Sequence, residues 1–304
     1  MITKSLRSSK ILLLLYIFIT CIFLSSEAQI NTDDKHPDSF SFIFITDIHL
    51  DYNENTLQYF NKAVNTINKL EPDFIITGGD NIKDATQPNE SYVDSLFNLY
   101  LSQIKRFNMP VYTGIGNHEC FGINNTNISP ENPFYGKKMY ESKIGERYYT
   151  FNYKDWKFFM IDDIKITDTG HNYIGFVDDE QMEWLKNELA ATDSITPIVI
   201  CSHIPFISSM KKFELGSLSG NPDNDGVANS IEFFKLFANH NLKLLLQGHF
   251  HFFEVLYAND IYYITGPSLN GRYGSLLTKK SGMLIFTTKS DSLTWKFVEN
   301  QIKY

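Results

Sequence analysis

The chain of 304 residues is long enough to bury a large core within one broad domain. Hydrophobic residues make up 43% of it and aromatic residues 15%, which excludes an intrinsically disordered, collagen-like or low-complexity protein. The formal net charge of -8 argues against a nucleic-acid partner, because an acidic surface repels polyanions.

The N-terminus has the features of an export signal. Three basic residues precede an uncharged, almost wholly apolar run, 11–24, which is shorter than the roughly 20 residues of a membrane-spanning helix. The small residues Ser26 and Ala28 follow this run. We therefore expect residues 1–28 to be a signal peptide cleaved near Ala28, leaving an exported domain, 29–304, that is periplasmic or secreted and has no stable membrane span. An uncleaved N-terminal anchor is the alternative.

Apolar runs and helical periodicities alternate through the first half of the remaining chain. Short apolar runs predict buried strands over 42–46, 74–77 and 111–115. Apolar residues at steps of three and four predict amphipathic helices over 57–70 and 92–107. This βαβαβ order favours a mainly parallel sheet with helices outside it, and ligands of such sheets gather at the carboxyl ends of the strands.

Closely spaced strands continue after residue 147. The pattern predicts a hairpin over 148–161, a helix over 179–190, a strand over 197–201 and a helix over 231–237. The last apolar runs predict strands over 242–246, 252–257, 261–265, 283–287 and 293–298. Neither an internal repeat nor a linker divides the chain, so we expect one domain with two sheets.

Polar clusters follow five of the predicted strands. They are Asp47-Ile48-His49, Gly78-Gly79-Asp80-Asn81, Gly116-Asn117-His118-Glu119, Ser202-His203 and Gly248-His249-Phe250-His251. Each cluster alone could be a turn or a structural histidine, but five of them at strand ends favour a common site. Carboxylate, amide and imidazole groups in this number can hold a pair of metal ions, and this mixture suits Mn, Fe or Zn better than Ca or Mg.

The motifs and their order resemble those of the calcineurin-like metallophosphoesterase superfamily. In chain order they are D-x-H, G-G-D-N, G-N-H-E, a lone histidine after a strand, and G-H-x-H. The resemblance covers roughly residues 40 to 270. It implies an α/β fold, a four-layer αββα sandwich with two central mixed β-sheets. It also implies a cofactor of two divalent or trivalent metal ions, with Mn, Fe and Zn as the candidates.

The resemblance assigns a role to each matching residue. The implied ligands are Asp47, His49 and His251 for one ion and Asn117, His203 and His249 for the other, with Asp80 bridging the two. His118 corresponds to the family histidine that faces the substrate phosphate. The implied reaction is in-line attack on phosphorus by a metal-bridging hydroxide, with His118 assisting the leaving group.

Two departures set the chain apart from familiar branches of the superfamily. Many relatives read G-D-x-x-D, whereas here Lys83 stands three positions after Asp80 and Asp84 comes one position later. In purple acid phosphatases the histidine of D-x-H is replaced and a tyrosine three positions after the bridging aspartate binds iron, but His49 and Lys83 occupy those places here. Because residues 147–203 nevertheless resemble purple acid phosphatases, the sequence indicates a non-purple relative without an Fe(III)-tyrosinate centre.

The substrate follows less directly from these motifs. We expect a small phosphate ester, with a slight preference for monoesters because of the middle region that resembles purple acid phosphatases. A phosphodiesterase of the cyclic-nucleotide or phospholipid type is the alternative, as is a non-catalytic protein that binds a phospholigand or a carbohydrate on the same fold. Arg272 could clamp a substrate phosphate bidentately, or simply lie in a surface turn. His171 and Tyr173 are further candidates for approach to the site.

The cysteine content excludes a disulfide scaffold. Only Cys120 and Cys201 remain after the predicted signal peptide. The sequence is compatible with one bridge between them and with two buried thiols. It does not fix the oligomeric state.

Overall fold

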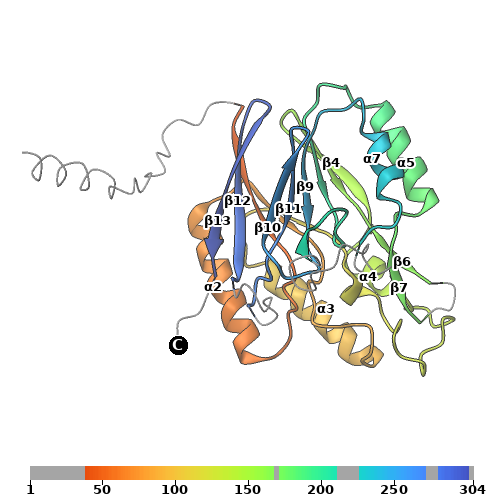
Figure 1. Cartoon of the computed structure of the whole chain (residues 1–304). Helices are drawn as coiled ribbons and strands as arrows, with labels where there is room; N and C mark the ends of the chain where they lie inside the picture. The colour runs from red at the N-terminus through yellow and green to blue at the C-terminus, as the bar shows by residue number, and fades with distance from the viewer. Residues whose placement is uncertain (1–37, 168–170, 211–225, 272–279, 301–304) are drawn as a thin grey trace, which may run out of the picture. The chain divides into compact units, whose positions relative to one another are not determined.

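A computed structural model describes residues 38–167, 171–210, 226–271 and 280–300 (Figure 1). These residues belong to one compact unit of the chain. The predicted signal peptide, 1–28, and the candidate substrate residue Arg272 lie outside the described residues. Among the helices that are described, none combines the length and apolar character needed to cross a membrane.

The first sheet gathers strands from both ends of the described chain. Its strands, in spatial order, are β13 (Ser292–Glu299), β12 (Gly282–Lys289), β1 (Phe40–Ile45), β2 (Phe74–Thr77) and β3 (Val111–Thr113). β1, β2 and β3 run parallel, whereas β12 pairs antiparallel with β1 and β13 antiparallel with β12. The parallel strands are mostly apolar because both faces of the sheet are covered.

The second sheet has the same mixed character. Its strands, in spatial order, are β10 (Glu254–Ala258), β11 (Ile261–Thr265), β9 (Leu242–Gln247), β8 (Ile198–Cys201), β5 (Trp156–Met160) and β4 (Tyr149–Tyr153). The four inner strands are parallel, and the two edge strands β4 and β10 are antiparallel to their neighbours. A separate hairpin, β6 (Ile164–Ile166) with β7 (Tyr173–Gly175), was not predicted from the sequence.

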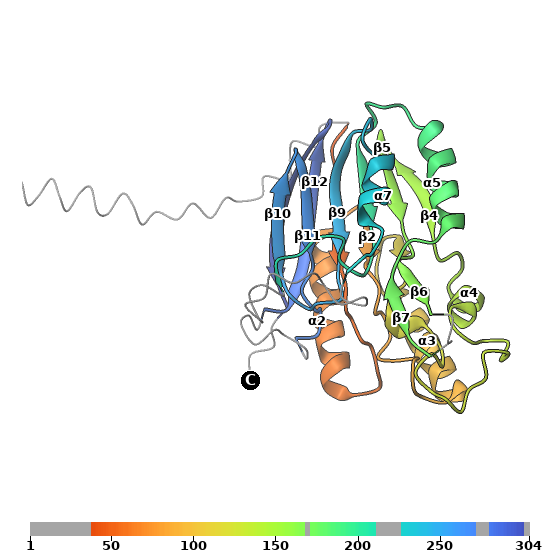
Figure 2. The same cartoon turned by 45° about the vertical axis from the view of Figure 1, so that its right-hand side comes forward.

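Two helices cover the outer face of each sheet (Figures 1 and 2). The helices are α2 (Glu54–Leu70) and α3 (Glu90–Ile104) on the first sheet, and α5 (Asp179–Ala190) and α7 (Ser230–Leu236) on the second. Phe60 of α2 packs in one core cluster with Ile75 of β2, and Leu185 of α5 packs in another with Ile198 of β8. The architecture is therefore αββα, which confirms the predicted fold class.

A third core fills the space between the two sheets and is rich in aromatic rings. Phe42 of β1 stacks on Phe74 at 5.3 Å between ring centroids and on Phe286 at 4.8 Å. Phe158 of the second sheet meets Phe42 edge-on at 5.5 Å. Such aromatic packing joins the sheets face to face, and it brings the carboxyl ends of their parallel strands to the same edge of the sandwich.

The structure departs from the predicted boundaries where the chain approaches the site. β3 ends at Thr113 instead of residue 115, since the chain leaves the sheet after a last hydrogen bond to β2, from Gly114 N to Thr77 O at 2.8 Å. The chain after β3 contains a 3-10 turn, Asn117–Glu119, and a short helix, α4 (Lys138–Lys143). Cys120 and Cys201 are free, buried thiols.

Candidate metal centre

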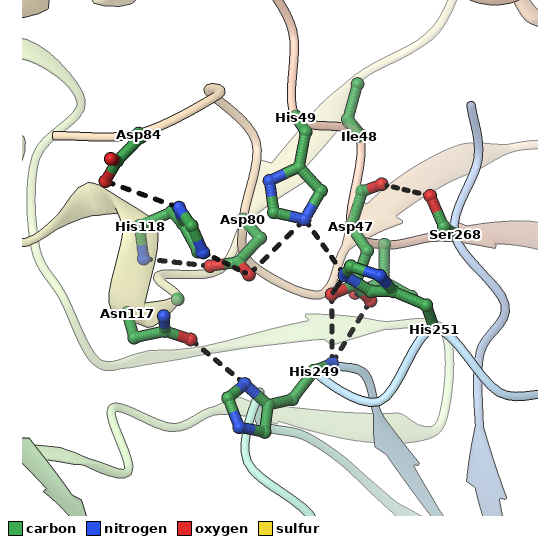
Figure 3. Close-up of polar contacts among 12 residues, drawn as sticks. Asp47, Ile48, His49, Asp80, Asp84, Asn117, His118, His249, His251 and Ser268 are labelled. Atoms are coloured by element: carbon green, nitrogen blue, oxygen red, sulfur yellow. Dashed lines mark hydrogen bonds and ion pairs between the residues drawn. The ribbon is translucent and has the colours of Figure 1, made fainter. Parts of the chain in front are cut away.

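The loops that follow five strands meet at the carboxyl edge of the two sheets (Figure 3). Backbone hydrogen bonds tie these loops together. Asp47 N donates to Gly79 O at 3.1 Å, and His49 N donates to Asp80 O at 2.8 Å. Gly248 N donates to His203 O at 2.9 Å, which joins the loops of the second sheet in the same way. The polar clusters singled out in the sequence therefore form one site.

A first group of donor atoms comes from Asp47, His49, Asp80 and His251, all within 4.8 Å of one another. His49 Nε2 lies 3.0 Å from His251 Nε2, and Asp47 Oδ1 lies 3.2 Å from the same nitrogen. Asp80 Oδ2 is 3.6 Å from His49 Nε2. Two imidazole nitrogens and two carboxylates thus converge on one small volume.

A second group comprises Asp80, His203 and His249, again with donor atoms within 4.8 Å. His203 Nε2 lies 3.3 Å from Asp80 Oδ2. Asn117 Oδ1 completes the group at 3.1 Å from His203 Nε2 and 3.0 Å from His249 Nδ1. Asp80 belongs to both groups, which is the position that a bridging ligand must occupy.

The backbone is strained at five of these seven residues. Asp47, His49, Asp80, His249 and His251 all have a positive φ, between 46° and 70°. For a residue with a side chain this left-handed conformation is unfavourable by roughly 1 kcal/mol or more. Strained backbone of this kind gathers at functional sites, where the surrounding structure holds side chains in place for a task.

Two of the histidines present neutral, unprotonated nitrogens to the site. Burial lowers the pKa of both His49 and His249 to about 4. At neutral pH these rings are therefore uncharged, and an uncharged imidazole is the form that binds a metal. His49 Nδ1 faces Lys83 O at 3.3 Å and His203 Nδ1 faces Gly78 O at 2.8 Å, so that Nε2 of each ring is directed to the donor groups.

The buried carboxylates of the site stabilise positive charge placed near them. Although burial opposes it, Asp80, Asp47 and Asp163 raise the pKa of His203 to about 10. The pKa of Asp80 lies well below its ordinary value despite its burial, because His203 and His118 stabilise the anion. The same carboxylates would stabilise a metal cation, and the nitrogen and oxygen donors fit Mn, Fe or Zn.

His118 is reachable from solvent, with 32% of its side chain exposed. Its backbone N–H donates to Asp80 Oδ1 at 2.9 Å, and its Nε2 faces Asp80 Oδ2 at 3.9 Å. Asp84 Oδ1 lies 3.4 Å from Nδ1, and the N–H and hydroxyl of Thr86 hold the Asp84 carboxylate in place. Although burial lowers it, Asp80 and Asp84 raise the pKa of His118 to about 9.

Asp84 therefore reaches His118 although it comes one position later than in the usual motif. Lys83, which occupies the usual position, has another task. Its Nζ pairs with Asp51 at 2.8 Å, and its backbone carbonyl is the atom that faces His49 Nδ1. Lys83 thus supports the first group through its main chain.

Glu119 has a structural role that the sequence analysis did not assign. Its buried carboxylate accepts four backbone N–H groups, from Gly116 at 2.7 Å, Asp80 at 2.9 Å, Asn81 at 2.7 Å and Ile82 at 3.1 Å. It holds the G-G-D-N and G-N-H-E loops together. Its place at the end of the G-N-H-E motif, the third of the five, was the signal for this role.

Two further residues support the D-x-H loop from a distant part of the sequence. Ser268 Oγ donates to Asp47 O at 2.9 Å, and Asn270 Nδ2 donates to Ile48 O at 2.9 Å. The sequence offered no signal for them, because more than 200 residues separate the partners. Tyr173, a candidate from the sequence, lies with its ring 6.4 Å from that of His249.

A family model described as calcineurin-like phosphoesterase matches residues 40–253. The chain belongs to the calcineurin-like phosphoesterase family. The match includes all five polar clusters, so this metal-dependent phosphoesterase domain carries two His/Asp groups consistent with a dimetal centre. A search of curated proteins found no match to the chain.

Solved structures of low sequence identity share the fold of this calcineurin-like phosphoesterase. A dimetal phosphatase from Danio rerio is 12% identical, with a TM-score of 0.64 over 86% of this chain and 96% of that chain. GAP50, described as the anchor in the inner membrane complex of Plasmodium, is 18% identical, with a TM-score of 0.56 over 86% of this chain and 85% of that chain. These likenesses concern the fold, namely two mixed sheets flanked by helices.

Proposed function

We propose that the protein is an exported phosphatase that hydrolyses small phosphate monoesters with the help of two metal ions. The observation that carries the proposal is the position of Asp80 between two groups of nitrogen and oxygen donors, with His118 beside it. Asp47, His49 and His251 would hold one ion, Asn117, His203 and His249 would hold the other, and Asp80 would be shared by both. Mn, Fe and Zn are the candidate ions.

The bound ions would neutralise charge on the phosphoryl oxygens and lower the pKa of a water molecule, so that attack on phosphorus proceeds near neutral pH. The chain's own groups position the reaction. Buried carboxylates and neutral imidazoles hold the ions, and the loops that carry them are fixed by Glu119, Ser268 and Asn270. Such positioning and charge stabilisation supply most of what phosphoryl transfer needs.

His118 acts on the leaving group. Its exposed ring can reach the substrate, and the nearby carboxylates of Asp80 and Asp84 favour its protonated form. A protonated imidazole donates its proton to the departing alkoxide, which is the acid role expected of this histidine. The Asp84 carboxylate faces Nδ1 of the ring at 3.4 Å, so that Nε2 remains available for the donation.

Three observations support the finer parts of the proposal. The preference for monoesters rests on the resemblance of residues 147–203 to purple acid phosphatases and on the likeness in fold to a dimetal phosphatase from Danio rerio. Export rests on the apolar run 11–24 between basic residues and the small residues Ser26 and Ala28. Hydrolysis of phosphate diesters is the competing activity, and the first experiment must distinguish it from hydrolysis of monoesters.

The experiment compares the hydrolysis of p-nitrophenyl phosphate and bis-p-nitrophenyl phosphate by the mature protein. The protein is stripped of metal and then reloaded with Mn, Zn or Fe. We expect turnover only after reloading, and a higher kcat/KM for the monoester. Asp80→Asn should lose this turnover, whereas the matched variant Asp291→Asn should keep it, because Asp291 is a surface residue with a side chain 65% exposed.

Each alternative outcome has a definite meaning. A higher kcat/KM for the diester would replace monoesterase with diesterase activity. Absence of turnover with every metal and both esters, in a folded protein that binds the ions, would contradict the proposed hydrolysis of small phosphate esters. Export is tested separately, by N-terminal sequencing of the protein recovered outside the cytoplasm, where cleavage near Ala28 is expected.

A further inference from the structure

Tyr173 lies beside the metal centre, and the proposed reaction assigns it no task. Its ring meets that of His249 edge-on, with 6.4 Å between the ring centroids and 85° between the ring planes. Both residues are half-buried, so this pair lies where the donor groups approach solvent. Aromatic rings in the chain after the G-N-H-E motif lie in the core by contrast, since Phe121 and Tyr140 have no exposure to solvent.

The structure around β7 holds Tyr173 in this place. Tyr173 is the first residue of the strand, and the last, Gly175, accepts through its carbonyl from Ala228 N at 2.8 Å. Just beyond the strand, the side chain of Asn229 accepts from Val177 N at 3.1 Å and donates to Val177 O at 2.7 Å. The ring is therefore in place before a substrate arrives, and a substrate that contacts it does not have to order it.

The exposure of the side chains shows from which side a substrate enters. Asp80, which both donor groups share, is only 2% exposed. His118 is 32% exposed and His249 is half-buried, so both rings border the open side of the centre. Asn117 links them, because it precedes His118 in the chain and its Oδ1 lies 3.0 Å from His249 Nδ1. A phosphate held at the centre therefore has its substituent on the side that Tyr173 borders.

A tyrosine ring at this position favours one class of leaving group. Its face is flat and apolar, and a second planar ring packs on it by stacking or edge-on contact. The attraction between two aromatic rings adds to the gain from burying apolar area. A saturated group of similar size has the gain from burial only.

We propose that Tyr173 is a specificity-determining residue, whose ring packs against a leaving group that carries an aromatic or heterocyclic ring. The preferred substrates are then phosphate monoesters of phenols and of alcohols with such a ring. The inference rests on the proposed function, because it concerns a substrate held at the two-ion centre. The contact acts alike on bound substrate and transition state, so its loss should raise KM for such esters and leave kcat unchanged.

Binding of unreactive analogues tests this role without turnover. In 3-phenylpropylphosphonate and 3-cyclohexylpropylphosphonate the rings have the same number of carbons, but only the phenyl ring is planar. Calorimetric titration of the Mn-loaded protein gives the Kd of each compound. We expect the wild type to bind the phenyl compound more tightly, and Tyr173→Leu to weaken its binding about 3- to 10-fold with little change for the cyclohexyl compound. Tyr173→Phe, which keeps the ring, should bind both as the wild type does.

Tyr257→Leu is the matched control. Tyr257 is 59% exposed, its ring lies 4.6 Å from that of Tyr262, and its hydroxyl donates to Asp260 at 2.9 Å. It belongs to neither donor group, so its substitution should leave the Kd of both analogues unchanged. A count of bound metal ions in each variant shows whether the centre is intact.

Three results would overturn the inference. They are equal affinity of the wild type for the two analogues, unchanged binding of the phenyl compound by Tyr173→Leu, and an equal loss for both compounds in this variant. If Tyr173→Leu does not retain its metal ions, Tyr173→Ile, which suits a strand, takes its place under the same expectation. Failure of the proposed function is a separate result, namely absence of p-nitrophenyl phosphate hydrolysis by a wild type that binds two ions and the phosphonates.

Discussion

The Asp84 carboxylate lies 3.4 Å from His118 Nδ1, while Nε2 of the same ring faces Asp80 at 3.9 Å. The imidazole thus lies between two carboxylates (Figure 3). One carboxylate belongs to the metal-binding residues and the other does not. The ring can therefore respond to the metal centre through Asp80 and be oriented independently through Asp84.

Asp84→Asn should lower kcat about 10-fold without changing the number of bound ions, because the ring of His118 loses its orienting charge. The loss should be greater for an alkyl phosphate than for p-nitrophenyl phosphate, whose leaving group needs little protonation. Steady-state kinetics on both substrates, together with metal analysis, check this prediction. An equal loss on both substrates would contradict a role of the pair in leaving-group protonation.

Glu119→Gln should destabilise the protein by about 2–4 kcal/mol, because four buried backbone N–H groups lose a shared carboxylate. The amide can accept through its single oxygen only, and its NH2 group faces N–H donors. Urea unfolding of the metal-free protein gives the change in the free energy of unfolding. A change below 1 kcal/mol would show that these loops do not depend on Glu119.

Gly116→Ala should prevent normal assembly of the centre. A Cβ atom at this position would overlap the backbone nitrogen and Oδ1 of Asp80. Because a well-packed site relieves such overlap only by shifting backbone, we expect a loss of about 1–3 kcal/mol in stability and weaker binding of both ions. Gly145→Ala, where a Cβ meets no atom within 4 Å but φ is 129°, shows the effect of backbone strain without overlap. Metal binding as in the wild type would contradict the prediction for Gly116.

We expect the protein to lose stability at alkaline pH because of the buried hydroxyl of Tyr100. Burial raises its pKa to about 12 from the ordinary value of 10.0, and its hydroxyl contacts Thr113 Oγ1 at 2.9 Å. The unfolded chain therefore releases this proton at a lower pH than the folded protein. Stability from this group is complete below pH 10 and should decrease by about 2–3 kcal/mol as the pH rises to 12.

The comparison variant is Tyr100→Phe, which lacks the ionising hydroxyl. Denaturant unfolding at several pH values should show a shallower alkaline decline for this variant than for the wild type. Other buried tyrosines contribute equally to both proteins, so the difference between the two curves isolates Tyr100. Parallel curves would contradict the assigned pKa.

The sequence predicted those elements whose pattern is local. The predicted bounds of the buried strand Phe74–Thr77 and of the helix Asp179–Ala190 agree residue for residue with the structure. Both elements are marked by a hydrophobic pattern that lies wholly within the element, so no distant contact was needed to predict them. The two-sheet α/β architecture was predicted as well. The hairpin of β6 and β7 was missed, since three-residue strands carry too little pattern to stand out from a loop.

The contacts that join distant segments at the site could not be predicted from the sequence. The meeting of the five strand-end clusters follows from the parallel arrangement of strands, and it was expected. The supports provided by Ser268 and Asn270 depend on the packing of loops far apart in the chain, so no local sequence pattern predicts them. The reach of Asp84 depends on the path of the loop after Asp80, which spacing alone does not determine.

The most direct test of the account is a count of bound metal ions per chain, by mass spectrometry of protein equilibrated with Mn and then freed of loosely bound metal. We expect two ions in the wild type, and loss of both from tight binding in Asp80→Asn, because Asp80 belongs to both donor groups. A single ion in the wild type, or two ions retained by folded Asp80→Asn, would contradict a dinuclear centre bridged by this residue.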